Sequence, residues 1–138
     1  MKQLTRSELR EKIMTILYQI NVYSSNKIEY EVDSIIKQVN PIDNEFVKDV
    51  VYGVITKKEE LDKIANKYLN KWTIDRLGNT DQSIIRMAIY ELLYTSTPEI
   101  VVINEAIELA KSFSDDDVKN MINGVLDKVY KNKDIHEQ

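Results

Sequence analysis

Two arginines near the N-terminus are the side chains of this sequence best placed to do chemistry, and that chemistry is phosphate binding. Arg6 and Arg10 are four residues apart, so on a helix both point the same way, and Lys2 precedes them. A guanidinium binds a phosphate through paired N–H groups. Tyr18 lies further along, roughly on the same face, where an exposed ring could stack on an unpaired base. The spacing also fits surface ion pairs with Glu11, and both interpretations stay open.

Two groups of carboxylates are further candidates, and we interpret both as surface features. Glu105 and Glu108 share a helix face, as paired carboxylates in acid–base or metal sites do. No Glu-x-x-His pair accompanies them, and Lys111 is placed to pair with Glu108. The aspartates at 115–117 lack the glycine and terminal glutamate of a calcium loop. They fit the start of a helix, which favours negative charge.

The reactive side chains argue against an enzyme. The chain has no cysteine and one histidine, His136. This excludes disulfides, thiol nucleophiles and cysteine zinc sites, and leaves too little for a Ser-His-Asp triad or a multi-histidine metal site. No glycine-rich phosphate loop is present. We therefore expect no catalytic activity, no cofactor and no metal.

The elements that must position these residues are helices, because apolar residues recur with a 3.6-residue period. The apolar ranges are 9–20, 28–39, 46–54, 61–68, 84–92, 100–110 and 118–129. The expected N-terminal caps are Thr5, Asp43, Thr56, Thr80 and Ser114, and the first, third and last of these form capping boxes with Glu8, Glu59 and Asp117. Whether 46–68 is one helix or two stays open, and Gly53 inside it is interpreted as a point of close helix packing.

Composition agrees with one all-α domain. The chain has 138 residues, of which 43% are hydrophobic and 30% charged, as in folded domains. Its 3 glycines and 2 prolines are too few for the turns of an all-β fold. We expect a single domain with six or seven helices, in which residues 70–80 join sub-bundles at 1–70 and 80–131, and residues 131–138 form a flexible tail. No signal peptide or membrane span is present, so a cytoplasmic protein is expected.

Charge is unevenly distributed along the chain. The net charge is −4, whereas the first 24 residues carry a net charge of +2. Any binding of nucleic acid must therefore be local or shared with a basic partner.

Five blocks spread over residues 5–130 carry a resemblance to a known family. They are Leu17–Tyr18, Phe46 with Gly53–Val54, Arg86–Leu92, Ile103–Lys111 with Phe113, and Asn123–Lys128. Together they resemble the NusB family of bacterial transcription antitermination factors. The resemblance implies a NusB-type fold of two helical sub-bundles packed crosswise, and a protein that is not an enzyme. It implies binding of the single-stranded boxA element of RNA together with NusE, a basic ribosomal protein. RNA polymerase and other Nus factors are then indirect partners, and termination is suppressed, notably in ribosomal RNA operons.

The resemblance also assigns RNA-binding residues at the N-terminus. The arginine-rich stretch of the family falls on residues 6–10, where Arg6 and Arg10 keep the pattern and Lys2 precedes them. Ser7 and Glu8 stand where many members have arginine.

Further residues are assigned along the chain by the same resemblance. Tyr18 matches a tyrosine near both RNA and NusE, and Asp81 stands where relatives have an acid that faces NusE. The family approaches RNA around residues 117–121, so Lys119 and Asn120 are expected to contact it. Met121 replaces an aromatic residue found in some relatives.

Two other functions are compatible with parts of the sequence. A NusB-like domain also serves as the RNA-binding module of a ribosomal RNA cytosine methyltransferase, but that enzyme needs cysteine nucleophiles in a fused domain. The other alternative is a helical homo-oligomer without an RNA role, in which dimerisation buries the arginine face.

Overall fold

The computed structural model describes residues 3–136, and within them it is helical apart from the connections. The helices are α1 (Arg6–Ser25), α2 (Val32–Val39), α3 (Glu45–Thr56), α4 (Lys58–Tyr68), α5 (Asn79–Tyr94), α6 (Glu99–Phe113), α7 (Asp116–Lys131) and α8 (Lys133–His136). A 3₁₀ turn, η1 (Ile74–Arg76), lies between α4 and α5. The prediction of an all-α fold is confirmed. None of the helices in residues 3–136 has the length and apolar character needed to cross a membrane.

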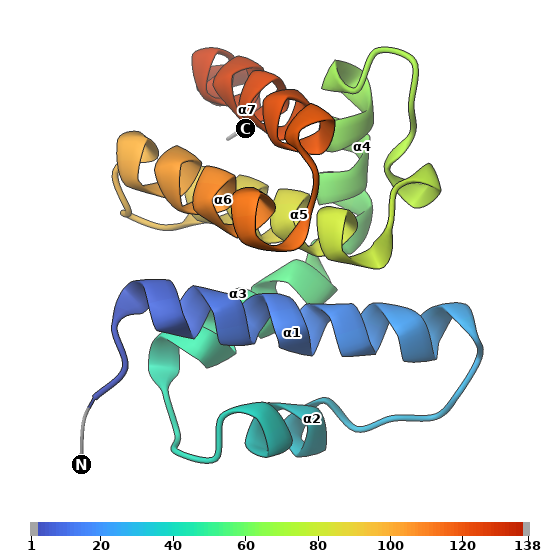
Figure 1. Ribbon diagram of the computed structural model, residues 1–138, viewed down its shortest axis with the longest axis vertical. Helices are drawn as coiled ribbons and strands as arrows, with labels where there is room; N and C mark the ends of the chain where they lie inside the picture. The colour runs from blue at the N-terminus through green and yellow to red at the C-terminus, as the bar shows by residue number, and fades with distance from the viewer. Residues whose placement is uncertain (1–2, 137–138) are drawn as a thin grey trace.

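The helices form two groups that meet where α1 packs against α5 (Figure 1). In this view α1, α2 and α3 occupy the lower half of the molecule and α4 to α7 the upper half. Helix α5 packs on α1 and α3 of the first group and on α4, α6 and α7 of its own. Because α4 packs mainly on α5 and α7, the boundary lies at Lys57, between α3 and α4, and not in residues 70–80 as the sequence suggested. The segment 69–78 is an excursion within the second group.

Helix α5 is buried over most of its length because both groups pack on it. Residues 82–93 are all buried, including the charged side chains of Arg86 and Glu91. Arg86 pairs bidentately with Asp62 of α4, through Nε to Oδ1 (2.7 Å) and Nη2 to Oδ2 (3.1 Å). Its Nη1 donates to Oδ1 of Asn21 on α1 at 3.3 Å. One guanidinium thus links α1, α4 and α5.

Gly53 lies where α3 packs most closely on α5. A Cβ atom at this position would lie 2.1 Å from Cζ of Tyr90, so the absence of a side chain makes room for the ring. The Tyr90 hydroxyl donates to Oδ1 of Asp49 on α3 at 3.0 Å. Burial, together with this bond to a carboxylate, raises the pKa of Tyr90 to about 12. The interpretation of Gly53 as a point of close helix packing is confirmed.

The capping box expected at the start of α1 is present. The Glu8 amide donates to Oγ1 of Thr5 at 3.1 Å, and the Thr5 amide donates to Oε1 of Glu8 at 3.0 Å. The second expected box is absent, because Thr56 ends α3 and Lys57 separates it from α4. Residues 46–68 therefore form two helices.

Three other helices begin close to, but not at, the expected cap. The N-cap positions are Asn44 for α3, Gly78 for α5 and Asp115 for α7. The carboxylate of Asp115 accepts from the Val118 amide at 2.9 Å, which replaces the box expected from Ser114. Helix α2 begins at Val32 rather than near Ile28, whose side chain is 50% exposed and outside the core.

The C-terminal segment is folded up to residue 136. Helix α8 follows α7 after one residue, and Nε2 of His136 lies 2.7 Å from the Tyr68 hydroxyl on α4. Burial, with a contribution from Lys67, lowers the pKa of His136. Within the tail expected to be flexible over 131–138, residues 133–136 are helical, and His136 contacts α4. Residues 137–138 lie outside the described residues.

Candidate nucleic-acid interface

Arg6 is exposed in the first turn of α1 and rests on an aromatic ring. Its guanidinium carbon lies 4.0 Å from the centroid of the Phe46 ring on α3. It forms no ion pair with another described residue. Contact with the face of a ring does not use the N–H groups of a guanidinium in an ion pair, so they remain available to a further acceptor. Arg6 therefore satisfies the geometry expected of a phosphate-binding side chain.

Arg10 does not share this exposure, although it lies one turn further along the same helix. Its side chain is 4% exposed, and it pairs bidentately with Glu91 of α5, through Nε to Oε2 (2.9 Å) and Nη2 to Oε1 (2.8 Å). Nη1 lies 3.9 Å from Oε1 of Glu105. Burial alone would lower the Arg10 pKa, but the two carboxylates outweigh it and the net shift is upward. The expectation that Arg10 offers its guanidinium to RNA needs correction, because Glu91 already occupies it in the interior.

The paired carboxylates on α6 have separate structural roles. Oε1 of Glu105 accepts a hydrogen bond from the Ser7 hydroxyl at 2.6 Å and lies near Arg10, so it ties α6 to the start of α1. Glu108 pairs with Lys111 at 3.2 Å on the surface, as the sequence predicted. No cluster of His, Asp or Glu within residues 3–136 is arranged to hold a metal ion.

Tyr18 and Asp81, the predicted NusE-contact residues, lie on α1 and α5, two helices that pack on each other. The Tyr18 side chain is 42% exposed. Asp81 is half-buried in the first turn of α5, and its Oδ1 accepts from the Ser114 hydroxyl at 2.6 Å. Nδ2 of Asn21 on α1 donates to Oε1 of Gln82 on α5 at 3.1 Å and joins the two helices.

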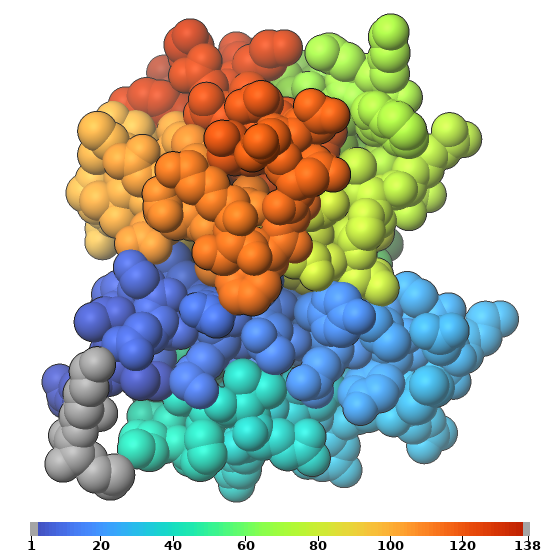
Figure 2. Space-filling model, in the orientation of Figure 1, coloured from blue at the N-terminus to red at the C-terminus, as the bar shows by residue number. Residues whose placement is uncertain are grey.

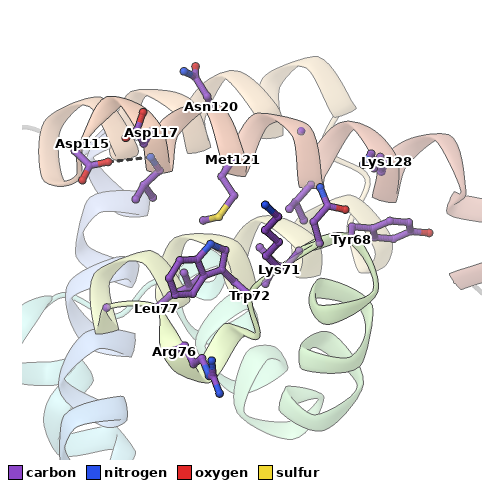
Figure 3. Close-up of a pocket in the computed structure, with 16 residues that line it drawn as sticks. Tyr68, Lys71, Trp72, Arg76, Leu77, Asp115, Asp117, Asn120, Met121 and Lys128 are labelled. Atoms are coloured by element: carbon purple, nitrogen blue, oxygen red, sulfur yellow. Dashed lines mark hydrogen bonds between the residues drawn. The ribbon is translucent and has the colours of Figure 1, made fainter.

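Lys119 and Asn120 lie in the second turn of α7 and have different surroundings. The Lys119 side chain is 27% exposed, with Nζ 3.8 Å from Oδ1 of Asp116. Asn120 is exposed and lies at the edge of a cavity, with its side chain directed away from it (Figure 3). Lys2, the remaining predicted RNA contact, lies outside the described residues.

This cavity was not predicted from the sequence. Its volume is about 750 Å³, and it lies between α7 and the segment from the end of α4 to the start of α5. We call it the Trp72 groove, and its defining residues are Lys71, Trp72, Leu77, Met121, Gly124 and Lys128. Figure 3 shows the Trp72 indole facing α7, with the Met121 side chain directed toward it. The sequence feature that could have indicated the cavity is Trp72, the only tryptophan of the chain, which lies where the helical period breaks.

The predicted RNA contacts among residues 3–136 lie on both groups of helices. Figure 2 shows α1 and the connection from α6 to α7 exposed on the same face of the molecule. Arg6 lies at the start of α1, whereas Lys119 and Asn120 lie on α7, in the other group of helices. An RNA that contacts both regions must cross the boundary between the two groups.

Comparison with known proteins identifies the relatives of this chain. The model of the NusB family matches residues 7–131. The transcription antitermination protein NusB of Macrococcus caseolyticus is 42% identical over 131 residues, which cover 94% of this chain and 99% of that protein. The T. maritima NusB structure superposes with a TM-score of 0.81 at 26% identity, covering 94% of this chain and 93% of that one.

A second similar structure contains a complex. It is the structure of the antitermination factors NusB and NusE in complex with dsRNA, and the matched chain has a TM-score of 0.77 at 26% identity, covering 91% of this chain and 96% of that chain. The family match over most of the chain, supported by full-length relatives and by the shared fold, leads to one conclusion: this chain belongs to the NusB family.

Proposed function

We propose that this protein is a transcription antitermination factor, which binds boxA-type single-stranded RNA together with NusE and suppresses termination. The observation that carries the proposal is the full-length similarity to a protein named for transcription antitermination. The similar structure of NusB and NusE in complex with dsRNA supports NusE and RNA as partners. The protein then acts by binding and not by catalysis, and reaches RNA polymerase through the other Nus factors.

The RNA contacts in this proposal begin at Arg6. Its guanidinium is exposed and held on the Phe46 ring, so it meets a phosphate without first losing side-chain freedom. Lys2 extends this basic end. Tyr18 offers an exposed ring for stacking, and Lys119 and Asn120 supply donors on α7.

The contacts to NusE in this proposal use α1 and α5. Tyr18 provides an amphipathic ring and Asp81 a carboxylate. A chain with a net charge of −4 attracts a basic partner, which speeds association and orients it. The basic partner in turn supplies positive charge that this chain lacks for RNA.

The test is fluorescence anisotropy of a labelled boxA RNA and a scrambled RNA, with and without NusE, at two salt concentrations. We expect a preference for boxA that becomes stronger when NusE is added. Weak binding that is equal for both RNAs under every condition would overturn the proposal.

A further inference from the structure

The contact between α1 and α5 has a polar link near each of its ends. Toward the start of α1, Arg10 pairs with Glu91, and toward the end of α1, Asn21 bonds to Gln82. The two helices therefore run antiparallel, and about three turns of α1, roughly 16 Å, separate the two links. The hydrophobic effect that holds the shared core between them is not directional. The polar links therefore specify where α1 lies along α5.

The side-chain amide of Asn21 is buried and has partners at both of its ends. Asn21 is 9% exposed. Its Oδ1 accepts from Nη1 of Arg86 at 3.3 Å. Its Nδ2 donates to Oε1 of Gln82 at 3.1 Å and to Oδ1 of Asn79. The amide cannot be turned over, because Nδ2 would then face the guanidinium of Arg86, donor against donor. Residues of α5 thus determine the direction of this amide.

The partners of Asn21 are themselves held in place. Arg86 pairs bidentately with Asp62 on α4. Nε2 of Gln82 donates to the carbonyl oxygen of Leu77, in the connection before α5, at 2.8 Å. Among the described residues, every buried side-chain nitrogen and oxygen atom has a partner. A network in which every member is satisfied makes the packing around it rigid and unique, which apolar contacts alone do not.

Asn21 lies close in sequence and in space to the two helix positions assigned to NusE. Tyr18 precedes it by nearly one turn of α1, and Asp81 directly precedes Gln82 on α5. A shift of α1 along α5 therefore changes the spacing between the Tyr18 ring and the Asp81 carboxylate. A partner that contacts both side chains binds best when this spacing is fixed in advance, because ordering them on binding costs affinity. The link at Arg10 lies about two turns before Tyr18, at the other end of the helix contact.

We propose that Asn21 is a positioning residue for the binding of NusE. Its bonds to Gln82 and Arg86 set the position of α1 on α5. That position sets the spacing of Tyr18 and Asp81, through which Asn21 acts without contacting NusE itself. This inference rests on the proposed function, since it concerns how the contacts to NusE are arranged. Specifying register is the best-attested use of a buried polar contact between helices.

The main variant is Asn21→Leu, which removes the amide and keeps a side chain of similar size. Isothermal titration calorimetry measures its affinity for NusE, and denaturant unfolding shows that it is folded. We expect roughly 5- to 150-fold weaker binding, the range typical of coupling between distinct parts of a protein. The matched control is Ile16→Val, which removes a methylene from the buried face of the same helix without touching the network. It should bind NusE as tightly as the parent protein.

The position of α1 on α5 has a direct readout, because the chain contains no cysteine and introduced cysteines can be spin-labelled selectively. Lys37→Cys on α2 and Lys131→Cys on α7 place one label at an exposed position of each group of helices. Electron paramagnetic resonance measures the distribution of distances between the labels. We expect a narrow distribution with Asn21 present, a broader one with Asn21→Leu, and a narrow one again when NusE is added. A residue with only a structural role would lower the melting temperature and leave this distribution unchanged.

A compensating pair of substitutions tests the direction of the bond. Asn21→Asp replaces the Nδ2 donor by a second acceptor, which then faces the acceptor Oε1 of Gln82. This variant should bind NusE more weakly, as Asn21→Leu does. Adding Gln82→Lys restores a donor opposite the carboxylate and should recover most of the affinity, whereas Gln82→Lys alone should weaken binding.

The outcomes separate this inference from the proposed function. If Asn21→Leu binds NusE as tightly as the parent protein, or loses no more affinity than Ile16→Val, the positioning role is overturned and the antitermination role stands. A distribution of label distances that stays narrow in the Asn21→Leu protein overturns the positioning role in the same way. If the parent protein does not bind NusE at all, both the inference and the proposed function are overturned.

Discussion

Arginine and glycine have opposite roles in two regions of the molecule. One region is the joint, where α1 and α3 pack on α5, and the other is the surface formed by the start of α1 and the Trp72 groove. In the joint, Arg10 is enclosed with Glu91, and Gly53 makes room for Tyr90. At the surface, Arg6 pairs with no carboxylate among the described residues, and Gly124 faces open space. A residue whose contacts are completed by its own chain holds the fold, whereas one whose contacts are left open is available to a partner.

The largest effect on stability is expected where the joint loses a charge. Arg10→Ala leaves the buried Glu91 without its partner, and breaking a buried pair in this way costs about 3–5 kcal/mol. Denaturant unfolding measures this loss. Replacing both partners, as Arg10→Met with Glu91→Leu, removes the unpaired charge and should recover most of the stability. A single variant that unfolds like the parent protein would show that the pair is not buried as described.

A smaller loss is expected when the other close contact of the joint is crowded. Gly53→Ala places a methyl group where the Tyr90 ring lies, and overpacking of this kind costs about 1–3 kcal/mol. Thermal unfolding monitored by circular dichroism measures it. Combining Gly53→Ala with Tyr90→Leu should cost less than the two single changes together, since the smaller side chain leaves room for the methyl group. Additive losses would mean that the ring does not occupy this space.

The sequence predicted the architecture better than the site, and the two arginines show why. Helical periodicity depends on neighbours along the chain, so the helices and the capping box at Thr5 and Glu8 could be predicted. The i, i+4 spacing made Arg6 and Arg10 equivalent, because the partner that separates them, Glu91, lies 81 residues away. The Trp72 groove likewise joins two segments distant in sequence, so only the folded chain brings Trp72 and Gly124 together.

Gly124 should respond to substitution in the opposite direction from Gly53. Gly124→Ala adds a methyl group in open space inside a helix, so it should stabilise the protein by about 0.5–1 kcal/mol. Thermal unfolding monitored by circular dichroism, as for Gly53→Ala, measures the difference in sign. A loss of stability at Gly124 would show that the fold itself requires this glycine, and the contrast between the two positions would disappear.

The smallest effect on stability is expected at Arg6, where the contrast with Arg10 is sharpest. Arg6→Gln changes an exposed side chain whose contact with Phe46 is worth about 0.5–1 kcal/mol, so unfolding should shift by no more than that. RNA binding should respond more, with the salt-dependence slope reduced by about 0.7 for the lost phosphate contact. Arg6→Lys keeps the charge but not the planar fork, so it should preserve the slope while weakening the affinity. If Arg6→Gln leaves the slope unchanged, the exposed arginine does not bind phosphate.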